Sequence, residues 1–197
     1  MEQKFIEALR NKDPITADHS IRVAKYSYEV GKVLGLPPTI LTDIRKGALL
    51  HDIGKLAIPN SILQKNDILT EEEYRIIKLH PGLGYDIHKK NNEPRIVQEI
   101  AHWHHERLDG SGYPDGLSGE EIPTHVRIVA VTDSFDAINS KRQYKDAVEP
   151  TIALELLAID ARNNKLDSTC VRILTKIVMS KINNNNKERV ESDYQAA

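Results

Sequence analysis

Seven residues of this sequence have side chains suited to metal chemistry and lie at or beside inward positions of predicted helices. Five are histidines and two are aspartates: His19, His51, Asp52, His80, His104, His105 and Asp133. A buried carboxylate is costly unless it is paired or binds a metal ion. Imidazole nitrogens mixed with carboxylate oxygens suit iron, manganese, zinc, cobalt or nickel better than calcium. The set predicts a transition-metal site inside a helical bundle, with residues contributed by different helices.

A purely structural role is the alternative for each of these residues. A single histidine on an apolar face is more often a satisfied core residue than a ligand, and Asp133 alone suits a buried hydrogen-bond acceptor. The structural role explains the whole set poorly, because the set includes the adjacent pairs His51-Asp52 and His104-His105. The other three histidines are predicted to lie outside the site, two at ordinary surface positions and one beside the site: His88, His125 and His102, respectively.

Helical periodicity extends over almost the whole chain, and no useful length of strand alternation is found. Prolines in first helical turns, a glycine stop and the capping box of Thr70 with Glu73 mark helix ends. The predicted helices cover residues 14–34, a segment from 38, residues 70–80 with a break at 81, residues 94–105 and 123–140, and two segments that begin near 150 and 167. Residues 109–119 hold four glycines and a proline, which predicts an ordered loop. We therefore expect an all-α fold, a single bundle of about seven helices with one Gly-rich loop.

Length and composition limit the classes of protein to consider. The 197 residues suffice for one domain, which we place at residues 1–182, while residues 183–197 are polar and predicted to be a flexible tail. The formal net charge of -2 excludes a global basic field for long nucleic acids. Neither a signal peptide nor a run of about eighteen apolar residues is found, so we expect a cytoplasmic protein without membrane insertion. The single cysteine, Cys170, lies in an apolar run and is predicted to be a core residue.

Two long strings resemble the signatures of a known family. His51-Asp52-Ile53-Gly54-Lys55 resembles the HD signature of metal-dependent phosphohydrolases, and residues 104–114, HHERLDGSGYP, resemble the second signature of the HD-GYP subgroup. The resemblance extends through flanking elements from about residue 13 to 175. An isolated HD dipeptide is a weak signal, but two long strings in the expected order are a strong one. The resemblance implies an HD-GYP catalytic domain with the Gly-rich loop beside the active site.

The resemblance also implies individual roles. The metal ligands would be His51, Asp52, His80, His104, His105 and Asp133, with Asp52 bridging two ions and His19 as a further histidine of the cluster. Lys55 matches a catalytic lysine that meets the substrate phosphate, and Tyr113 lies in the loop beside the substrate groove. Arg142 and Lys145 match basic residues that hold the ligand. Without the family match, a solvated helix end explains that last pair equally well.

The implied activity is a phosphodiesterase that hydrolyses cyclic di-GMP to linear pGpG, with onward hydrolysis to GMP left open. Two transition-metal ions, iron or manganese, would share a water and hold it as hydroxide, and no organic cofactor is expected. A sister substrate, 3′,3′-cyclic GMP-AMP, is an enzymatic alternative, and a domain that binds the dinucleotide or a partner protein without turnover is another. A general HD nucleotidase would leave the GYP segment unexplained. A regulatory domain, a partner protein and a homodimer all remain open.

Ile15 departs from the family pattern. Many members carry a glutamate at this position, one helical turn before His19, and it helps to hold a third metal ion. Isoleucine offers no lone pair and would make the pocket drier, so we expect two ions and mainly the linear dinucleotide as product. Gln143 stands where the family often has proline, and we attach no interpretation to it.

Overall fold

The structure is a computed structural model that describes residues 2–65, 67–140 and 148–195, with side chains described up to residue 184. The described ranges are all-helical, as predicted, and one isolated bridge joins Asp109 to Ser118 without forming a strand. Their α-helices are α1 (Glu2–Lys12), α2 (Pro14–Val33), α3 (Pro38–Leu50), α4 (Asn60–Leu63), α5 (Glu71–Ile77), α6 (His80–Lys90), α7 (Arg95–Trp103), α8 (Thr124–Asn139), α9 (Pro150–Arg162) and α10 (Ser168–Gln195). Two short 3₁₀ helices, η1 (Ile53–Ala57) and η2 (Gly119–Glu121), complete the list. No helix within these ranges is long and apolar enough to cross a bilayer.

Local sequence signals determine several helix ends. The Asp13 carboxylate accepts a hydrogen bond from the backbone N–H of Thr16 and caps α2, which begins with a proline as predicted. The capping box at the start of α5 is present in both directions between Thr70 and Glu73. The predicted helix over 70–80 ends earlier, at Ile77, and the predicted break lies before His80 rather than at 81, because Pro81 lies in the first turn of α6. A proline fits there because first-turn N–H groups need no intrahelical partner.

The described ranges contain more helices than the seven or so predicted. Helix α1 was missed although Phe5, Ile6 and Leu9 have helical spacing, because the segment is short and its other residues are mostly charged or polar. The short α4 has no buried residue and gives no sequence signal. Helix α10 continues through the predicted tail to Gln195, since most polar residues cost less than about 1 kcal/mol each in a helix that has already formed. The domain boundary after residue 182 and the flexibility of residues 183–197 stay predictions.

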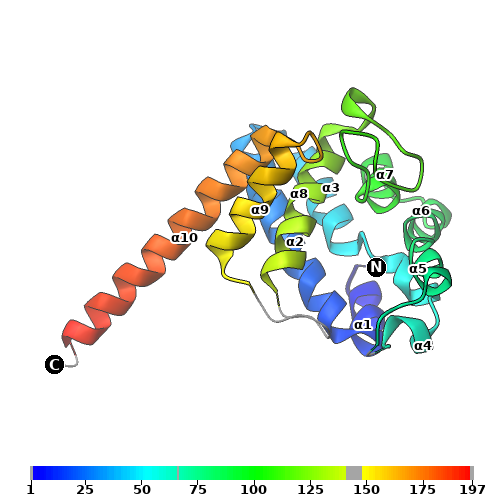
Figure 1. The fold of residues 1–197 in the computed structure, drawn as a ribbon, viewed down its shortest axis with the longest axis horizontal. Helices are drawn as coiled ribbons and strands as arrows, with labels where there is room; N and C mark the ends of the chain where they lie inside the picture. Colours follow the sequence, from blue (N-terminus) through cyan, green and yellow to red (C-terminus); the bar gives the residue numbers. More distant parts are fainter. Residues whose placement is uncertain (1, 66, 141–147, 196–197) are drawn as a thin grey trace.

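Helix α8 lies at the centre of the core, where α2, α3, α7, α9 and α10 all contact it (Figure 1). It is buried on nearly every side, and its largest buried side chain is Phe135. Cys170 on α10 is 2% exposed and belongs to the same core, as predicted. A helix that is buried all round positions any polar side chain on it within the protein interior. Asp133 and Asp136 on α8 are therefore buried carboxylates.

Candidate metal centre

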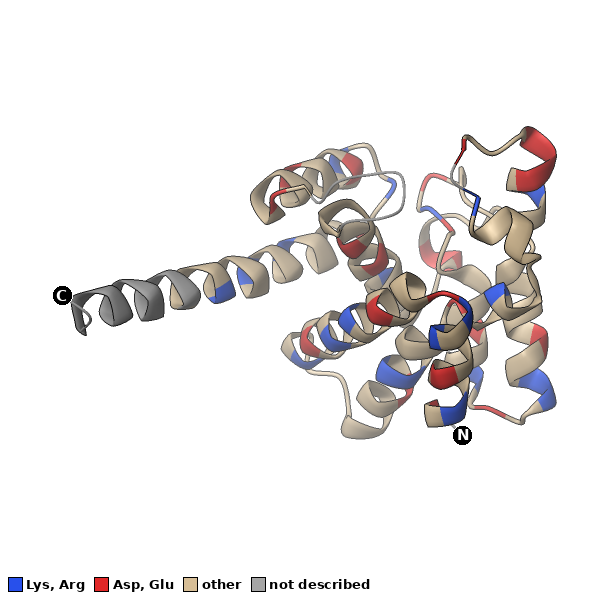
Figure 2. Ribbon diagram, turned by 90° about the horizontal axis from the view of Figure 1, so that it is seen from below, with Lys and Arg blue, Asp and Glu red and all other residues tan. Residues whose placement is uncertain are grey.

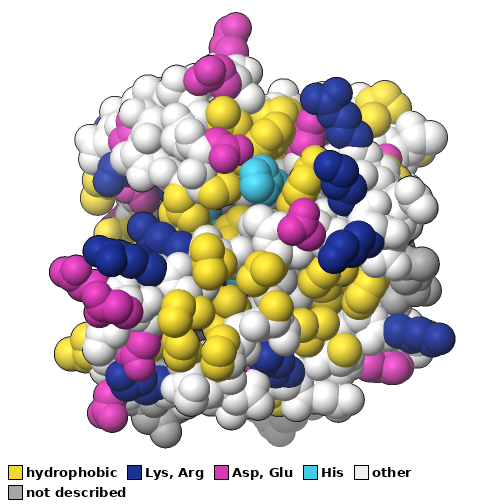
Figure 3. All heavy atoms as spheres, turned by 90° about the vertical axis from the view of Figure 1, so that its right-hand side faces the viewer, with side chains coloured by type: hydrophobic (Ala, Val, Ile, Leu, Met, Phe, Trp, Pro, Cys, Tyr) yellow, Lys and Arg dark blue, Asp and Glu magenta, His cyan; other side chains and the backbone are white. Residues whose placement is uncertain are grey.

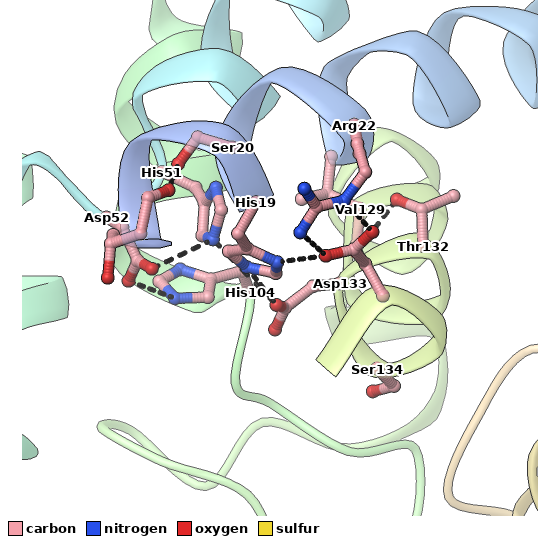
Figure 4. Close-up of polar contacts among 12 residues, drawn as sticks. His19, Ser20, Arg22, His51, Asp52, His104, Val129, Thr132, Asp133 and Ser134 are labelled. Carbon is pink, nitrogen blue, oxygen red and sulfur yellow. Dashed lines mark hydrogen bonds and ion pairs between the residues drawn. The ribbon is translucent and has the colours of Figure 1, made fainter. Parts of the chain in front are cut away.

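The seven predicted site residues come together at one place, carried by five regions of the chain. His19 lies within α2, and His51 and Asp52 follow α3 directly. The remaining four begin α6, follow α7 or lie within α8: His80, His104, His105 and Asp133. All but the half-buried His105 are buried. Figure 4 shows that His19, His51, Asp52, His104 and Asp133 point toward one another from separate elements.

Asp52 lies between two groups of histidines, and its two oxygens face different partners. Oδ1 lies 3.1 Å from Nε2 of His80 and 3.9 Å from Nε2 of His104. Oδ2 lies 3.3 Å from Nε2 of His51 and 2.7 Å from Nζ of Lys55. A carboxylate placed in this way is suited to bridge two cations, one on each side.

Backbone carbonyls set the orientation of three histidine rings. Nδ1 of His51 lies 2.7 Å from the carbonyl oxygen of Ala48, and Nδ1 of His80 lies 2.7 Å from that of Ile77. Nδ1 of His104 lies 3.1 Å from the carbonyl oxygens of residues 100 and 101. Because a carbonyl only accepts, each Nδ1 must carry the hydrogen, and a neutral ring then has its lone pair on Nε2. Metal-binding histidines in proteins are held in this way.

With the rings in these orientations, hydrogen-bond acceptor atoms of the site face one another without a donor between them. This arrangement tests whether a metal ion fits the site. The Nε2 lone pairs of His80 and His104 face each other at 3.3 Å and both face Oδ1 of Asp52. That oxygen is buried and makes no hydrogen bond with described residues. Buried acceptors without donors are costly. A cation among them would satisfy all of these atoms at once, so the residues present fit a metal site.

The candidate ligand atoms form two triads, and Asp52 lies between them. Atoms of His80, His104 and His105 lie within 4.8 Å of one another, and so do atoms of His19, His51 and Asp133. Atoms of Asp52, His51 and His104 also lie within 4.8 Å of one another. This third group shares one histidine with each triad and so connects the two. The ring centroids of His104 and His105 lie 4.1 Å apart.

Carboxylates hold the ring of His19 on both sides. Its Nδ1 lies 2.7 Å from Oδ2 of Asp136, and its Nε2 lies 3.0 Å from Oδ1 of Asp133. Arg22 donates two hydrogen bonds to Asp136, at 2.7 and 2.9 Å, and Ser140 donates another. Asp136 is 1% exposed and was missed as a site residue. Its place one helical turn after Asp133 on the same inward stripe was the available signal.

The carboxylates of the site are ionised. Burial alone would raise the pKa of Asp52, but the nearby ammonium group of Lys55 holds that pKa well below its usual range. Burial would likewise raise the pKa of Asp133, and its bond to His19 lowers it well below the usual range instead. Both groups thus carry the negative charge that a cation requires.

The histidines of the site divide into two kinds. Burial lowers the pKa of His104 well below its usual range, and burial lowers the pKa of His105 to about 3. Both rings are therefore neutral, which is the form that binds a metal. Burial also acts to lower the pKa of His19, but its bonds to Asp133 and Asp136 outweigh burial and raise it.

A hollow with a histidine at its base opens on the face that includes α5 and α6, and hydrophobic, Lys and Arg side chains border it (Figure 3). Tyr113 of the Gly-rich loop stacks on the ring of His105 with centroids 4.6 Å apart and an interplanar angle of 25°. Nζ of Lys78 lies 4.8 Å from the ring centroids of both Tyr113 and Tyr74. Lys55 is 15% exposed at its side chain, so it is accessible from solvent. Arg142 and Lys145 lie outside the described residues, and their role stays a prediction.

Glu106 organises the Gly-rich loop and was also missed. Its carboxylate accepts hydrogen bonds from three backbone N–H groups, those of Asp115, Gly116 and Leu117, at 2.8 to 3.1 Å. The loop packs directly on this residue, since a Cβ added to Gly112 would collide with the backbone of Glu106. Its position immediately after His104-His105 was the available signal. Glu106 thereby helps to place Tyr113 against His105.

Two histidines expected at the surface lie deeper than predicted. His88 is fully buried, and its Nε2 lies 3.3 Å from the carbonyl oxygen of Leu50. His125 is half-buried, and its Nε2 lies 2.7 Å from a carboxylate oxygen of Glu99. Each ring therefore has a partner within the fold, which explains how it can leave the solvent.

Two further predictions concern the surroundings of the site. His102 is half-buried, and its Nε2 lies 3.2 Å from a carboxylate oxygen of Asp115; its predicted place beside the site stays a prediction. Ile15 is 39% exposed, and its effect on the pocket stays a prediction.

A family model described as HD domain matches residues 3–170. The chain belongs to the HD domain family. This confirms the resemblance drawn from the two signature strings, and proteins of this kind depend on metal ions. The HD domain is 42% identical over 176 residues to the cyclic di-GMP phosphodiesterase response regulator RpfG of Xanthomonas campestris, covering 88% of the chain and 46% of RpfG.

Two further comparisons show proteins to which the HD domain is similar. It is 37% identical over 173 residues to 3′3′-cGAMP-specific phosphodiesterase 3 of Vibrio cholerae, covering 88% of the chain and 37% of that protein. The chain thus spans less than half the length of these curated relatives. The solved HD domain of the Listeria monocytogenes phosphodiesterase PgpH, in complex with cyclic-di-AMP, shares the fold with a TM-score of 0.69 and 20% identity, covering 92% of the chain and 96% of that domain.

Proposed function

We propose that this HD domain is a metal-dependent phosphodiesterase that hydrolyses cyclic di-GMP to linear pGpG. The observation that carries the proposal is the set of mutually facing acceptors around Asp52, which need cations between them. Two ions, iron or manganese, would be held by the triad His80, His104 and His105 and by the triad His19, His51 and Asp133, with Asp52 between them. Bound transition-metal ions supply an activated water and neutralise charge on the phosphoryl oxygens.

The residues of the chain have separate tasks in this reaction. Water adds to phosphorus, the bond from phosphorus to the ribose 3′ oxygen breaks, and that oxygen takes up a proton. Lys55, whose Nζ bonds to Asp52, lies where it can place a positive charge against a non-bridging phosphoryl oxygen. Tyr113 stacks on His105 and has Lys78 near its ring, and a guanine base that takes the place of Lys78 could stack on this tyrosine.

The second candidate substrate is 3′,3′-cyclic GMP-AMP. The 37% identity to a phosphodiesterase named for that nucleotide supports this alternative. The 42% identity to a phosphodiesterase named for cyclic di-GMP favours the first substrate. A direct comparison distinguishes them: purified chain is loaded with manganese or iron(II), incubated with each dinucleotide separately, and the products are resolved by chromatography. We expect faster turnover of cyclic di-GMP, and faster turnover of the mixed dinucleotide would reverse the assignment.

Asp52→Ala tests the site itself. We expect this variant to lose turnover and to bind less metal, while circular dichroism shows that the helices remain, because packing supplies most helix stability. Asp86→Ala is a matched control, since Asp86 is an exposed aspartate on α6. Turnover that persists in Asp52→Ala with unchanged metal content would overturn the proposal.

The metal count is tested at Ile15. Its side chain lies one helical turn before His19, where a carboxylate could share an ion with that ring. We propose two ions per chain for the wild type, and elemental analysis of protein prepared without chelators measures the count. Ile15→Glu should increase it. A fully occupied third ion beside His19 in the wild-type protein would contradict the two-ion proposal.

A further inference from the structure

Helix α9 presents an apolar ridge to solvent. Ile152, Leu156 and Ile159 are 48%, 41% and 43% exposed, and their spacing places them on one stripe of the helix. The opposite side of α9 is buried against the core through Ala153, Leu154 and Leu157. Single exposed apolar side chains are ordinary, but a stripe over two helical turns indicates a surface that another element covers.

Acidic side chains border this α9 ridge. At about 100° per residue, Glu155 falls on one side of the ridge and Asp160 on the other. Glu155 is exposed and Asp160 is half-exposed. The ridge is therefore apolar along its crest, with one acidic side chain on each flank and with the basic Arg162 two turns after Glu155 on the same flank.

A groove of ≈ 520 Å³ lies beside the ridge, between α9 and α10. Small or apolar side chains form its floor: Ala158, Ala161 and Val171. Basic side chains form its rim: Arg162, Arg172 and Lys176, all of them exposed. Met179, 36% exposed, continues the α10 wall by about one helical turn. The α9–α10 groove is thus apolar inside and positive at its edges.

We propose that this face is the interface of a homodimer, in which the α9 ridge of each copy enters the α9–α10 groove of the other. A two-fold interface requires one surface that is complementary to itself. Ridge and groove meet this requirement in shape, because an apolar stripe fits a groove with a small-residue floor. They also meet it in charge, because the flanks of the ridge are acidic and the rim of the groove is basic.

The proposed interface lies apart from the metal centre. None of the seven predicted site residues is on α9 or α10. Figure 1 shows these two helices on the side of the molecule opposite α5 and α6, and Figure 2 shows the same separation from below. A dimer formed in this way leaves the hollow over the histidines open, so variants at this face should keep the activity per chain.

Sedimentation equilibrium on the full chain tests the assembly. We expect a dimer for the wild type and a monomer for Leu156→Glu, because a charge on the crest of the ridge would enter an apolar groove. Val33→Glu is the matched control, since Val33 is 60% exposed at the end of α2 and outside this face. Circular dichroism verifies that both variants fold. A monomeric wild type, which would leave the face to a different partner, or a dimeric Leu156→Glu overturns the proposal.

Charge reversal gives a test that does not depend on lost packing. One variant carries Glu155→Lys and Asp160→Lys, so its ridge and groove are both basic. A second carries Arg162→Glu, Arg172→Glu and Lys176→Glu, so its ridge and groove are both acidic. Each should be monomeric alone through repulsion, and an equimolar mixture should form a heterodimer. A mixture that stays monomeric, while the wild type dimerises, would place the dimer contact elsewhere on the chain and overturn the proposal.

Discussion

Nδ1 of His19 lies 2.7 Å from a carboxylate oxygen of Asp136, whereas backbone carbonyls hold the corresponding atoms of His51, His80 and His104. A carboxylate partner makes a ring a stronger base than a carbonyl partner does. Of these four histidines, His19 is therefore the candidate ligand whose affinity for a cation should depend most on one side chain outside the cluster.

Asp136→Asn should weaken metal binding by about 10- to 100-fold, the range seen when such supporting carboxylates are changed. The amide keeps the size of the side chain but removes the charge that orients His19 and pairs with Arg22. Calorimetric titration of metal-free protein with manganese measures the effect. Asp18→Asn is the control, because Asp18 is an exposed aspartate on the same helix as His19. Equal affinities for both variants would mean that Asp136 only anchors Arg22.

Glu106→Ala should raise KM more than it lowers kcat. The change removes the acceptor of three backbone N–H groups, so the Gly-rich loop loses its anchor while the metal ligands stay in place. We expect the free energy of unfolding to fall by about 1–3 kcal/mol, the cost of unsatisfied buried donors.

Two comparisons define the Glu106 result. Glu106→Gln should be intermediate, since its amide oxygen can still accept two of the three bonds. Glu121→Ala removes an exposed capping-box carboxylate from the same loop region and should leave KM unchanged. Steady-state kinetics on the proposed substrate gives all three values. A kcat loss without a change in KM in Glu106→Ala would assign Glu106 to the chemical step instead.

Gly54→Ala should destabilise the protein and impair metal binding. A Cβ at this position would collide with the carbonyl oxygen of His80 and lie 2.6 Å from the backbone nitrogen of Gly84, so α6 would have to move. Overpacking of this kind costs about 1–3 kcal/mol or more. Gly82→Ala is the control. Gly82 lies on α6, the helix that Gly54→Ala would displace, and no atom lies within 4 Å of its added Cβ. Thermal unfolding with and without manganese compares the two, and equal melting temperatures would show that α6 shifts freely.

Acidification should destabilise the metal-free protein between pH 6.5 and 3. Below its ordinary pKa of 6.5, His105 takes up a proton in the unfolded chain but stays neutral when folded, until the pH reaches about 3. The unfolded state then binds more protons, so the free energy of unfolding falls as the pH falls. His104 acts in the same direction, while the raised pKa of His19 gives stability that is complete at low pH and is lost as the pH rises through it.

The pH prediction is measured by thermal unfolding in chelator at pH 7 and pH 5. His105 alone should account for about 2 kcal/mol of the loss, at roughly 1.4 kcal/mol per pKa unit. His105→Gln should reduce the difference between the two pH values. An unchanged difference in this variant would show that His105 is protonated in the folded protein.

The sequence by itself determined the helical class, most helix ends and the identity of the seven clustered residues. These features depend on information local in the chain: apolar periodicity, the cap at Asp13, the box at Thr70 and the two signature strings. The same information misplaced His88, because a half-apolar neighbourhood does not say which side of α6 faces the protein.

Only the tertiary structure decided how the clustered residues face one another. Asp136 and Glu106 act through partners 117 residues and about ten residues away in the chain, and no local pattern encodes those pairings. The two triads of candidate ligands lie on either side of Asp52. Their positions depend on where α3 and α7 end and where α6 begins relative to one another. The physical reason is that residue types follow from sequence, whereas distances between side chains on different helices follow from how the whole core packs.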